Sequence, residues 1–170
     1  MDKKENIERI NTNIADRFDK VEKKLSGAGS TAELFEMLLT QIEAEFQVPF
    51  IWISVADTIK TGRVIDAFKS SRILKDRLNV IKADQFREIF FSGLQPILVN
   101  KNLRPYYRLF PPNQKYFIKS LAMVPFKING EVAGSWNNGD AIQNRYSPDM
   151  ETSLLKKLSR QLSARLDELL

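Results

Sequence analysis

The sequence contains no cysteine and no histidine among its 170 residues. Without cysteine the chain has no thiol nucleophile and no disulfide, and without histidine it lacks the commonest metal ligand and general base. A Ser-His-Asp triad and the usual zinc sites are therefore excluded. No Gly-rich phosphate loop or paired carboxylates stand out either, so we predict that the chain is not an enzyme and holds no metal.

Long apolar runs are also missing. No segment approaches the roughly 18 residues of a membrane span, and the N-terminal residues lack the apolar core of a signal peptide. We therefore expect a cytoplasmic protein with no membrane partner. The 26 basic and 21 acidic residues give a formal charge of +5, but the two signs are interspersed. Nucleic acid accordingly ranks low among the expected partners.

Apolar residues at gaps of three and four predict amphipathic helices at both ends of the chain. The first is expected over residues 3–25, ending at the glycines of segment 26–29. Ser30 and Glu33 indicate a capping box that opens a second helix, which Pro49 closes. The segment Ser147-Pro148-Asp149 is typical of a helix start, so the last helix is expected from there to the C-terminus.

Several short β-branched and aromatic runs predict strands, at 50–55, 63–69, 96–99, 120–128 and 131–137. The Asn129-Gly130 pair between the last two predicts a tight hairpin, because both of its central residues need positive φ. Residues 71–81 and 84–91 are expected to be helical, and 137–140 are interpreted as a turn. Because the strands outnumber those of a βαβ repeat, the predicted fold class is α+β with an antiparallel sheet.

The C-terminal half of the chain resembles the ending of GAF domains. In "SLAMVPFKINGEVAGSW" (120–136) a strand with an internal proline, an Asn-Gly turn and a glycine-containing partner strand follow in order. "RYSPDMETSLLKKLSRQLSARL" (145–166) then supplies the aromatic-serine start of the last helix. The nearer resemblance is to the bacterial group called domain of unknown function 484, itself GAF-like. It assigns residues 30–170 to the domain and 1–29 to a preceding helix and linker.

This resemblance implies a five- or six-stranded antiparallel sheet with helices on both faces and a ligand pocket on one of them. It also implies a homodimer formed through the terminal helices. GAF proteins that attach a bilin covalently or reduce free methionine sulfoxide use cysteine, which this chain lacks, so neither chemistry is expected. Haem is not expected either. The signature of the cyclic-nucleotide-binding group is absent as well. The cofactor is therefore unknown.

The segment "RPYYRLFPP" (Arg104 to Pro112) lies in a stretch, 89–130, that contains no acidic residue. In the family's arrangement this segment forms a lid over the pocket, and tyrosine and arginine suit an anionic or aromatic ligand. The predicted ligand-binding residues in the lid and on the strands beneath it are Arg104, Tyr106, Tyr107, Arg108, Ser120, Ser135 and Trp136. The alternative is that the rings fill the core and the serines bond to neighbouring backbone.

Two functions follow as hypotheses. The first is a sensory module, a homodimer that binds a small molecule and signals to a separate partner whose identity is unknown. The second is a dimerisation scaffold whose pocket is shrunken or empty. Nucleic-acid binding, with Arg104, Arg108, Lys115 and Lys119 on phosphates, stays a weaker third.

Overall fold

The computed structural model describes residues 3–111 and 117–170, with side chains from Arg9 onward except that of residue 10. Pro112 and Lys115, named above, lie outside the described residues. The elements in chain order are α1 (Lys3–Ser26), α2 (Thr31–Phe46), β1 (Phe50–Asp57), the short 3-10 helix η1 (Ile59–Thr61), α3 (Gly62–Ser70), the 3-10 helix η2 (Lys75–Arg77), β2 (Leu78–Lys82), α4 (Ala83–Ile89), β3 (Ile97–Val99), the 3-10 helix η3 (Arg104–Leu109), β4 (Ser120–Ile128), β5 (Glu131–Asp140) and α5 (Ser153–Leu169).

The strands form one five-stranded sheet in the order β2-β1-β5-β4-β3. Three of the pairings are antiparallel, and β1 pairs with β2 in parallel. The α+β fold class and a five-stranded sheet are confirmed. The expectation of a wholly antiparallel sheet is wrong at the β2 edge.

This error arose because a strand followed by a helix was predicted where the structure has a helix followed by a strand. Residues 63–69, expected to be a strand, lie in α3, where Val64, Ile65 and Phe68 are buried at helical spacing. Residues 78–81, expected at the end of a helix over 71–81, lie in β2. A helix between two strands allows them to run parallel, whereas a tight turn would have made them antiparallel.

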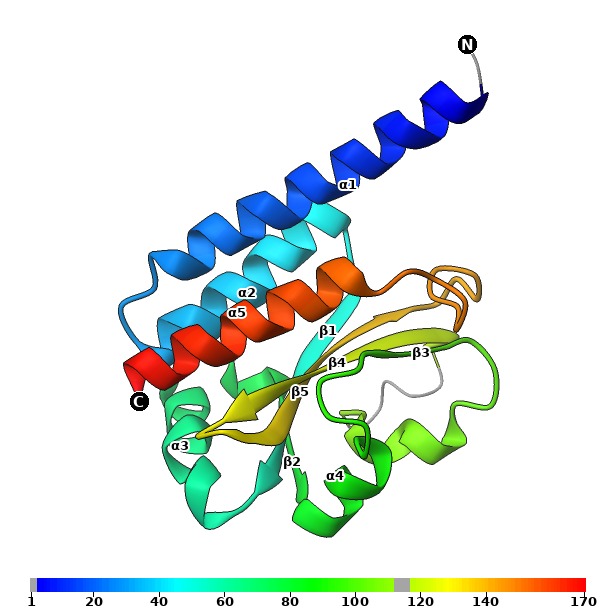
Figure 1. Cartoon of the computed structure of the whole chain (residues 1–170). Helices are drawn as coiled ribbons and strands as arrows, with labels where there is room; N and C mark the ends of the chain where they lie inside the picture. Colours follow the sequence, from blue (N-terminus) through cyan, green and yellow to red (C-terminus); the bar gives the residue numbers. More distant parts are fainter. Residues whose placement is uncertain (1–2, 112–116) are drawn as a thin grey trace.

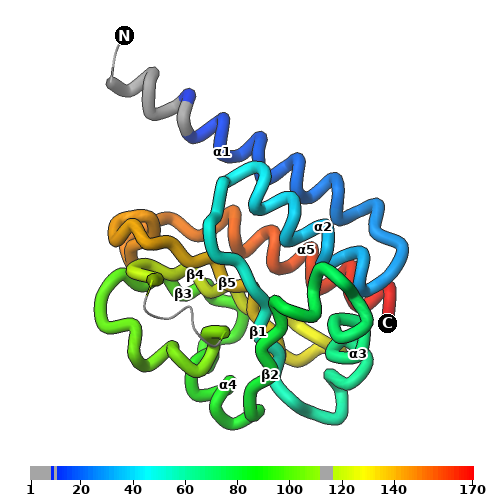
Figure 2. Tube along the Cα trace, turned by 180° about the vertical axis from the view of Figure 1, so that it is seen from behind, coloured from blue at the N-terminus to red at the C-terminus, as the bar shows by residue number. Residues whose placement is uncertain are grey.

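Helices cover both faces of the sheet (Figure 1). α2 and α5 lie side by side on one face with α1 packed outside them, whereas α4 and η3 lie on the other. Figure 2 shows the same layers from behind, with β1 and β2 adjacent and α3 beside them. Phe18, Val21 and Leu25 of α1 are buried. The C-terminal half of α1 therefore belongs to the core of this protomer.

Local signals were most reliable at turns and caps. Asn129 and Gly130 have φ of 51° and 82°, which confirms the predicted hairpin turn. The Ser30 hydroxyl accepts the Glu33 N–H at 3.2 Å, which confirms the start of α2. Residues 137–140, interpreted above as a turn, instead continue β5.

The last helix begins later than the sequence predicts. The Ser147 hydroxyl donates to Asp149, and the Met150 N–H donates to the Ser147 carbonyl at 3.1 Å, so this segment is a turn. α5 begins at Ser153, where the Glu151 carboxylate accepts the N–H at 2.6 Å. Ser147, Pro148 and Asp149, which are typical of a helix start, therefore form a turn that precedes α5.

Ring contacts identify which side chains point to which face of the sheet. Phe126 of β4 meets Phe35 of α2 at 5.3 Å, and Trp52 of β1 meets Phe110 after η3 at 5.3 Å. Side chains alternate along a strand. We call the side of the sheet covered by α1, α2 and α5 the helix face, and the side covered by α4 and η3 the lid face.

In the described part of the chain no helix has the length and apolar character that crossing a bilayer requires.

Candidate functional site

The segment expected to form a lid does lie over the sheet. η3 has a proline in its first turn, where the missing backbone N–H of proline leaves no hydrogen bond unmade. Leu109 and Phe110 at the end of η3 are buried. The Phe110 ring packs edge-on against Trp52 and Tyr107 at 5.3 Å each. Tyr107 is half-buried. The lid is therefore anchored by its own aromatic residues.

The floor beneath the lid is a chain of buried polar groups. The Ser135 hydroxyl donates to Asn137 Oδ1 at 3.0 Å, and Asn137 Nδ2 donates to the Ser54 hydroxyl at 3.1 Å. The Ser54 hydroxyl and the Trp52 indole N–H both donate to the Leu109 carbonyl, at 2.9 and 2.6 Å. The floor thus bonds to the lid itself, and a ligand between them would have to displace η3.

We expect Ser54→Ala to lower the free energy of unfolding by about 2 kcal/mol, because it leaves the buried amide of Asn137 without its acceptor. It also removes one of two donors to the Leu109 carbonyl, so the amide of Phe110 should exchange with solvent faster. Urea unfolding and hydrogen exchange measure the two effects. Ser92→Ala, at an exposed serine, is the control and should change stability by less than about 0.5 kcal/mol. Equal effects in both variants would show that the floor does not anchor the lid.

The structure divides the predicted site residues among different places. Ser135 is part of the floor chain on the lid face, whereas Trp136, its neighbour in β5, points to the helix face. Ser120 also lies toward the helix face, where its hydroxyl donates to the Ile142 carbonyl at 2.7 Å. Ser120, Ser135 and Trp136 therefore do not line one common space.

The four lid residues also separate. Arg104 and Arg108 are exposed, and the Arg108 guanidinium bonds to the Glu88 carboxylate of α4 at 2.7 Å. Tyr106 and Tyr107 are half-buried and pack against the core. Of these four, Arg104 and Tyr107 are among the described residues that line one hollow.

This hollow, which we call the basic hollow, has a volume of about 660 Å³ and is lined by residues 100–104, Tyr107, Ile118, Lys119 and Gln143. Its cationic side chains are Lys101, Arg104 and Lys119, and no carboxylate is among its lining residues. Gln143 closes one side, donating from Nε2 to the Asn100 carbonyl at 3.1 Å. Three positive charges around one hollow favour an anion.

Sequence reasoning missed Lys101 and Gln143 and assigned Lys119 only to the nucleic-acid alternative. The acid-free stretch 89–130 was the available signal, since it contains all three cations of the hollow. Gln143 comes from a different part of the chain, and only the fold brings it there. Asn137 was missed because its segment was interpreted as a turn.

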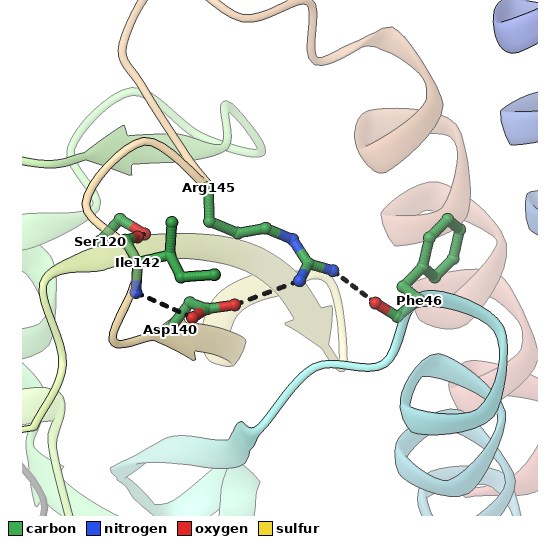
Figure 3. Close-up of polar contacts among 5 residues, drawn as sticks. All are labelled: Phe46, Ser120, Asp140, Ile142 and Arg145. Atoms are coloured by element: carbon green, nitrogen blue, oxygen red, sulfur yellow. Dashed lines mark hydrogen bonds and ion pairs between the residues drawn. The ribbon is translucent and has the colours of Figure 1, made fainter.

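A second polar cluster joins the end of β5 to α2 (Figure 3). The Asp140 carboxylate accepts the Ile142 N–H at 2.9 Å and pairs with the Arg145 guanidinium at 3.1 Å. The same guanidinium donates to the Phe46 carbonyl at the C-terminal end of α2. We call Asp140, Arg145 and the Phe46 carbonyl the clamp. A cation at the C-terminus of a helix is favourable for its unpaired carbonyls and its dipole.

Tyr146, next to the clamp, is largely removed from solvent. Burial raises the pKa of its hydroxyl to about 12 against an ordinary 10.0, and the nearby Arg145 guanidinium opposes that rise. Tyr146 is therefore a neutral hydrogen-bonding group across the physiological range. Over residues 3–111 and 117–170, no cluster of acidic side chains forms that could hold a metal ion.

The arrangement described so far is the GAF fold: a central sheet with the terminal helices on one face, and shorter helices and an irregular lid on the other. Among solved structures, the GAF domain of a phosphoenolpyruvate-protein phosphotransferase from Acinetobacter superposes with a TM-score of 0.56. It shares 14% sequence identity, and the match covers 91% of this chain and 92% of that one.

A methyl-accepting chemotaxis protein, solved as residues 122 to 287, matches with a TM-score of 0.55 and 16% identity, over 91% of this chain and 98% of that one. No protein-family model matches the sequence, and no curated protein does. The comparisons thus establish the GAF fold, as the sequence resemblance predicted. They give no support to assignment within domain of unknown function 484.

Proposed function

We propose that this chain is a non-catalytic regulatory module that binds a small anion in the basic hollow. The observation that carries the proposal is the grouping of Lys101, Arg104 and Lys119 around one hollow without a carboxylate. None of the three forms an ion pair with a described residue, in contrast to Arg108. Membership of domain of unknown function 484 is part of the same proposal and rests on residues 120–136 and 145–166.

The hollow is connected to the helices through the clamp. Lys119 follows the lid, and its N–H donates to the Asp140 carbonyl at 2.8 Å. The Asp140 side chain pairs with Arg145, which caps α2. An anion that draws Lys119 and Gln143 together therefore acts on the segment that joins β5 to α5. Such a ligand regulates only if it binds one arrangement of that segment more tightly than another.

The experiment is a thermal-shift panel of citrate, glutamate, pyrophosphate and nucleoside monophosphates on the full chain, followed by calorimetry of any compound that binds. A specific ligand at about 100 times its dissociation constant adds about 2.7 kcal/mol of stability. The double variant Lys101→Glu/Arg104→Glu should lose this gain, because it reverses two of the three charges of the hollow. The matched control is Lys69→Glu/Arg72→Glu, which changes the net charge by the same amount at two exposed positions outside the hollow. It should keep the gain in stability.

Equal binding by both double variants would disprove the basic hollow as the site. A flat panel would refute the proposal and favour the scaffold. Steep salt dependence of oligonucleotide binding would favour nucleic acid instead. Against that third function, Tyr106 and Tyr107 are half-buried in the core rather than displayed for stacking on bases.

The dimerisation scaffold is retained as a second candidate because two observations favour it. The lid is bonded directly to the floor of the sheet through Leu109. The first helix extends beyond the body of the protomer (Figure 1), and Ile14 on it is 36% exposed. A second copy that covers this apolar side chain would form the homodimer expected from the sequence. Sedimentation velocity of the full chain measures the oligomeric state directly.

A further inference from the structure

A cavity of about 550 Å³ lies on the helix face, on the opposite side of the sheet from the lid. It is lined by residues of α1, α2, β3, β5 and α5 and by the segment that leads into α5. We call it the helix-face cavity. Its size falls in the range of small-molecule sites. Its apolar walls are formed by Phe18, Ile42, Phe46, Leu98, Leu154 and Leu155.

Asn138 of β5 contributes a polar group to this cavity. The residue is 5% exposed, and its Oδ1 atom is buried without a hydrogen-bond partner among the described residues. Its neighbours in register are Ile51 on β1 and Ala122 on β4, neither of which has a side-chain donor. Buried acceptors are nearly always bonded, because desolvation without a compensating bond is unfavourable. In the wall of this cavity, the unpaired amide oxygen of Asn138 is an acceptor that a donor on a bound molecule would satisfy.

The charged groups at the cavity are Arg17, Arg145 and Glu151. Arg145 is engaged in the clamp, and the Glu151 carboxylate accepts the Ser153 N–H at 2.6 Å. That bond lowers the pKa of Glu151 below its ordinary value, so the group is ionised at neutral pH. Arg17 of α1 makes no hydrogen bond or ion pair to any residue that the structure describes. It is the charge still available to a ligand.

We propose that the helix-face cavity binds a small amphiphile: an apolar body, a hydroxyl or N–H that donates to Asn138 Oδ1, and a carboxylate that pairs with Arg17. The apolar walls remove the body of the molecule from water. The buried amide selects for a donor, because a molecule without one leaves Oδ1 unpaired. The cavity is separate from the basic hollow, so this inference does not depend on the proposed function.

Occupancy of this cavity would join the helical layer to the sheet. Phe18 is on α1, Phe46 on α2 and Leu154 on α5, and their rings and methyl groups face one space. Phe18 and Phe46 already touch each other at 4.8 Å between ring centroids. A ligand in contact with all three helices stabilises the arrangement in which they converge. The terminal helices then respond to the ligand directly, without a signal through the lid.

The test compares two probes that differ in one donor, 10-hydroxydecanoate and decanoate, by calorimetry on the full chain below their micellar concentrations. We expect 10-hydroxydecanoate to bind about tenfold more tightly, the equivalent of about 1.4 kcal/mol. Asn138→Leu should abolish that preference. It should also raise the melting temperature of the free protein, because it replaces an unpaired buried amide with an apolar group of similar size. A purely structural role for Asn138 predicts the opposite change in melting temperature.

Arg17→Gln is the second variant, at a helical position where glutamine is well tolerated. It should weaken both probes by about tenfold and preserve their ratio. Lys101→Glu/Arg104→Glu should bind both probes as the unmodified chain does, which separates this site from the basic hollow. Equal affinity for the two probes, no binding of either, or a preference that survives Asn138→Leu would each overturn the proposal. The proposal would also be overturned if neither probe binds and Asn138→Leu changes the self-association of the protein. In that case a second copy of the chain would occupy the cavity.

Discussion

Gly134→Ala is expected to lower the free energy of unfolding by about 3 kcal/mol. An added Cβ would stand 2.3 Å from Cζ and 2.5 Å from Cε2 of Phe126, its partner in register on β4. The Phe126 ring is fully buried and contacts Phe35, which in turn contacts Phe68. The ring therefore has no free space to enter, and the clash must be relieved by moving the core.

The measurement is urea-induced unfolding, with the midpoint and slope compared between variants. Gly62→Ala is the control, because Gly62 has φ of −55° and nothing lies within 4 Å of an added Cβ. It should be neutral or stabilising by about 0.4–1 kcal/mol. Phe126→Leu should lower the free energy of unfolding less in the Gly134→Ala background than in the unmodified chain, because the smaller side chain leaves room for the added methyl group. A cost below about 0.5 kcal/mol for Gly134→Ala would refute the tight packing of this ring.

Arg145→Met is expected to cost about 2–3 kcal/mol, because it removes the partner of a buried carboxylate. The Asp140 side chain is 6% exposed and that of Arg145 is 31% exposed. Without the guanidinium, Asp140 keeps the Ile142 N–H as its one partner among the described residues, and the Phe46 carbonyl loses its Arg145 donor. The charge of Asp140 then remains in a site that cannot solvate it.

A double-mutant cycle with Asp140→Asn isolates the pair. Arg145→Met/Asp140→Asn should be more stable than Arg145→Met, because the uncompensated charge is gone. Arg108→Met, which breaks an ion pair between side chains 50% and 64% exposed, should lower the free energy of unfolding by about 0–1 kcal/mol. Thermal or urea unfolding measures all four variants. If Arg145→Met were no more costly than Arg108→Met, the clamp would not stabilise the junction of β5 and α2.

The parts of this fold that could be predicted are those that depend on residues adjacent in the sequence. The hairpin at Asn129-Gly130 and the cap at Ser30 depend on backbone conformations that few residue types favour, and they are found where expected. The exchanged assignments of α3 and β2 have another origin. β2 is a short strand whose partner, β1, is some 25 residues away in register, with Ile53 opposite Leu78. Such pairing is decided by tertiary contacts rather than by local preference.

The candidate site was predictable only in its residue types. Tyrosines and arginines in the lid pointed to a covered face, and Leu109 and Phe110 do cover it. The Leu109 carbonyl of the lid accepts hydrogen bonds from Trp52 and Ser54. These contacts depend on three-dimensional distances that residue spacing in the sequence does not reveal. Asn138 was overlooked for a related reason. Whether an asparagine is paired or unpaired is a property of its three-dimensional neighbours.

The strand order has a consequence for how the chain acquires its structure during synthesis. β5 is the last strand made, yet it occupies the centre of the sheet and supplies the partner of both β1 and β4. A nascent chain that has emerged only through β3 therefore exposes an unpaired edge of β1 and the apolar side chains of α2. Native pairing of β1 must therefore wait until the C-terminal hairpin has left the ribosome.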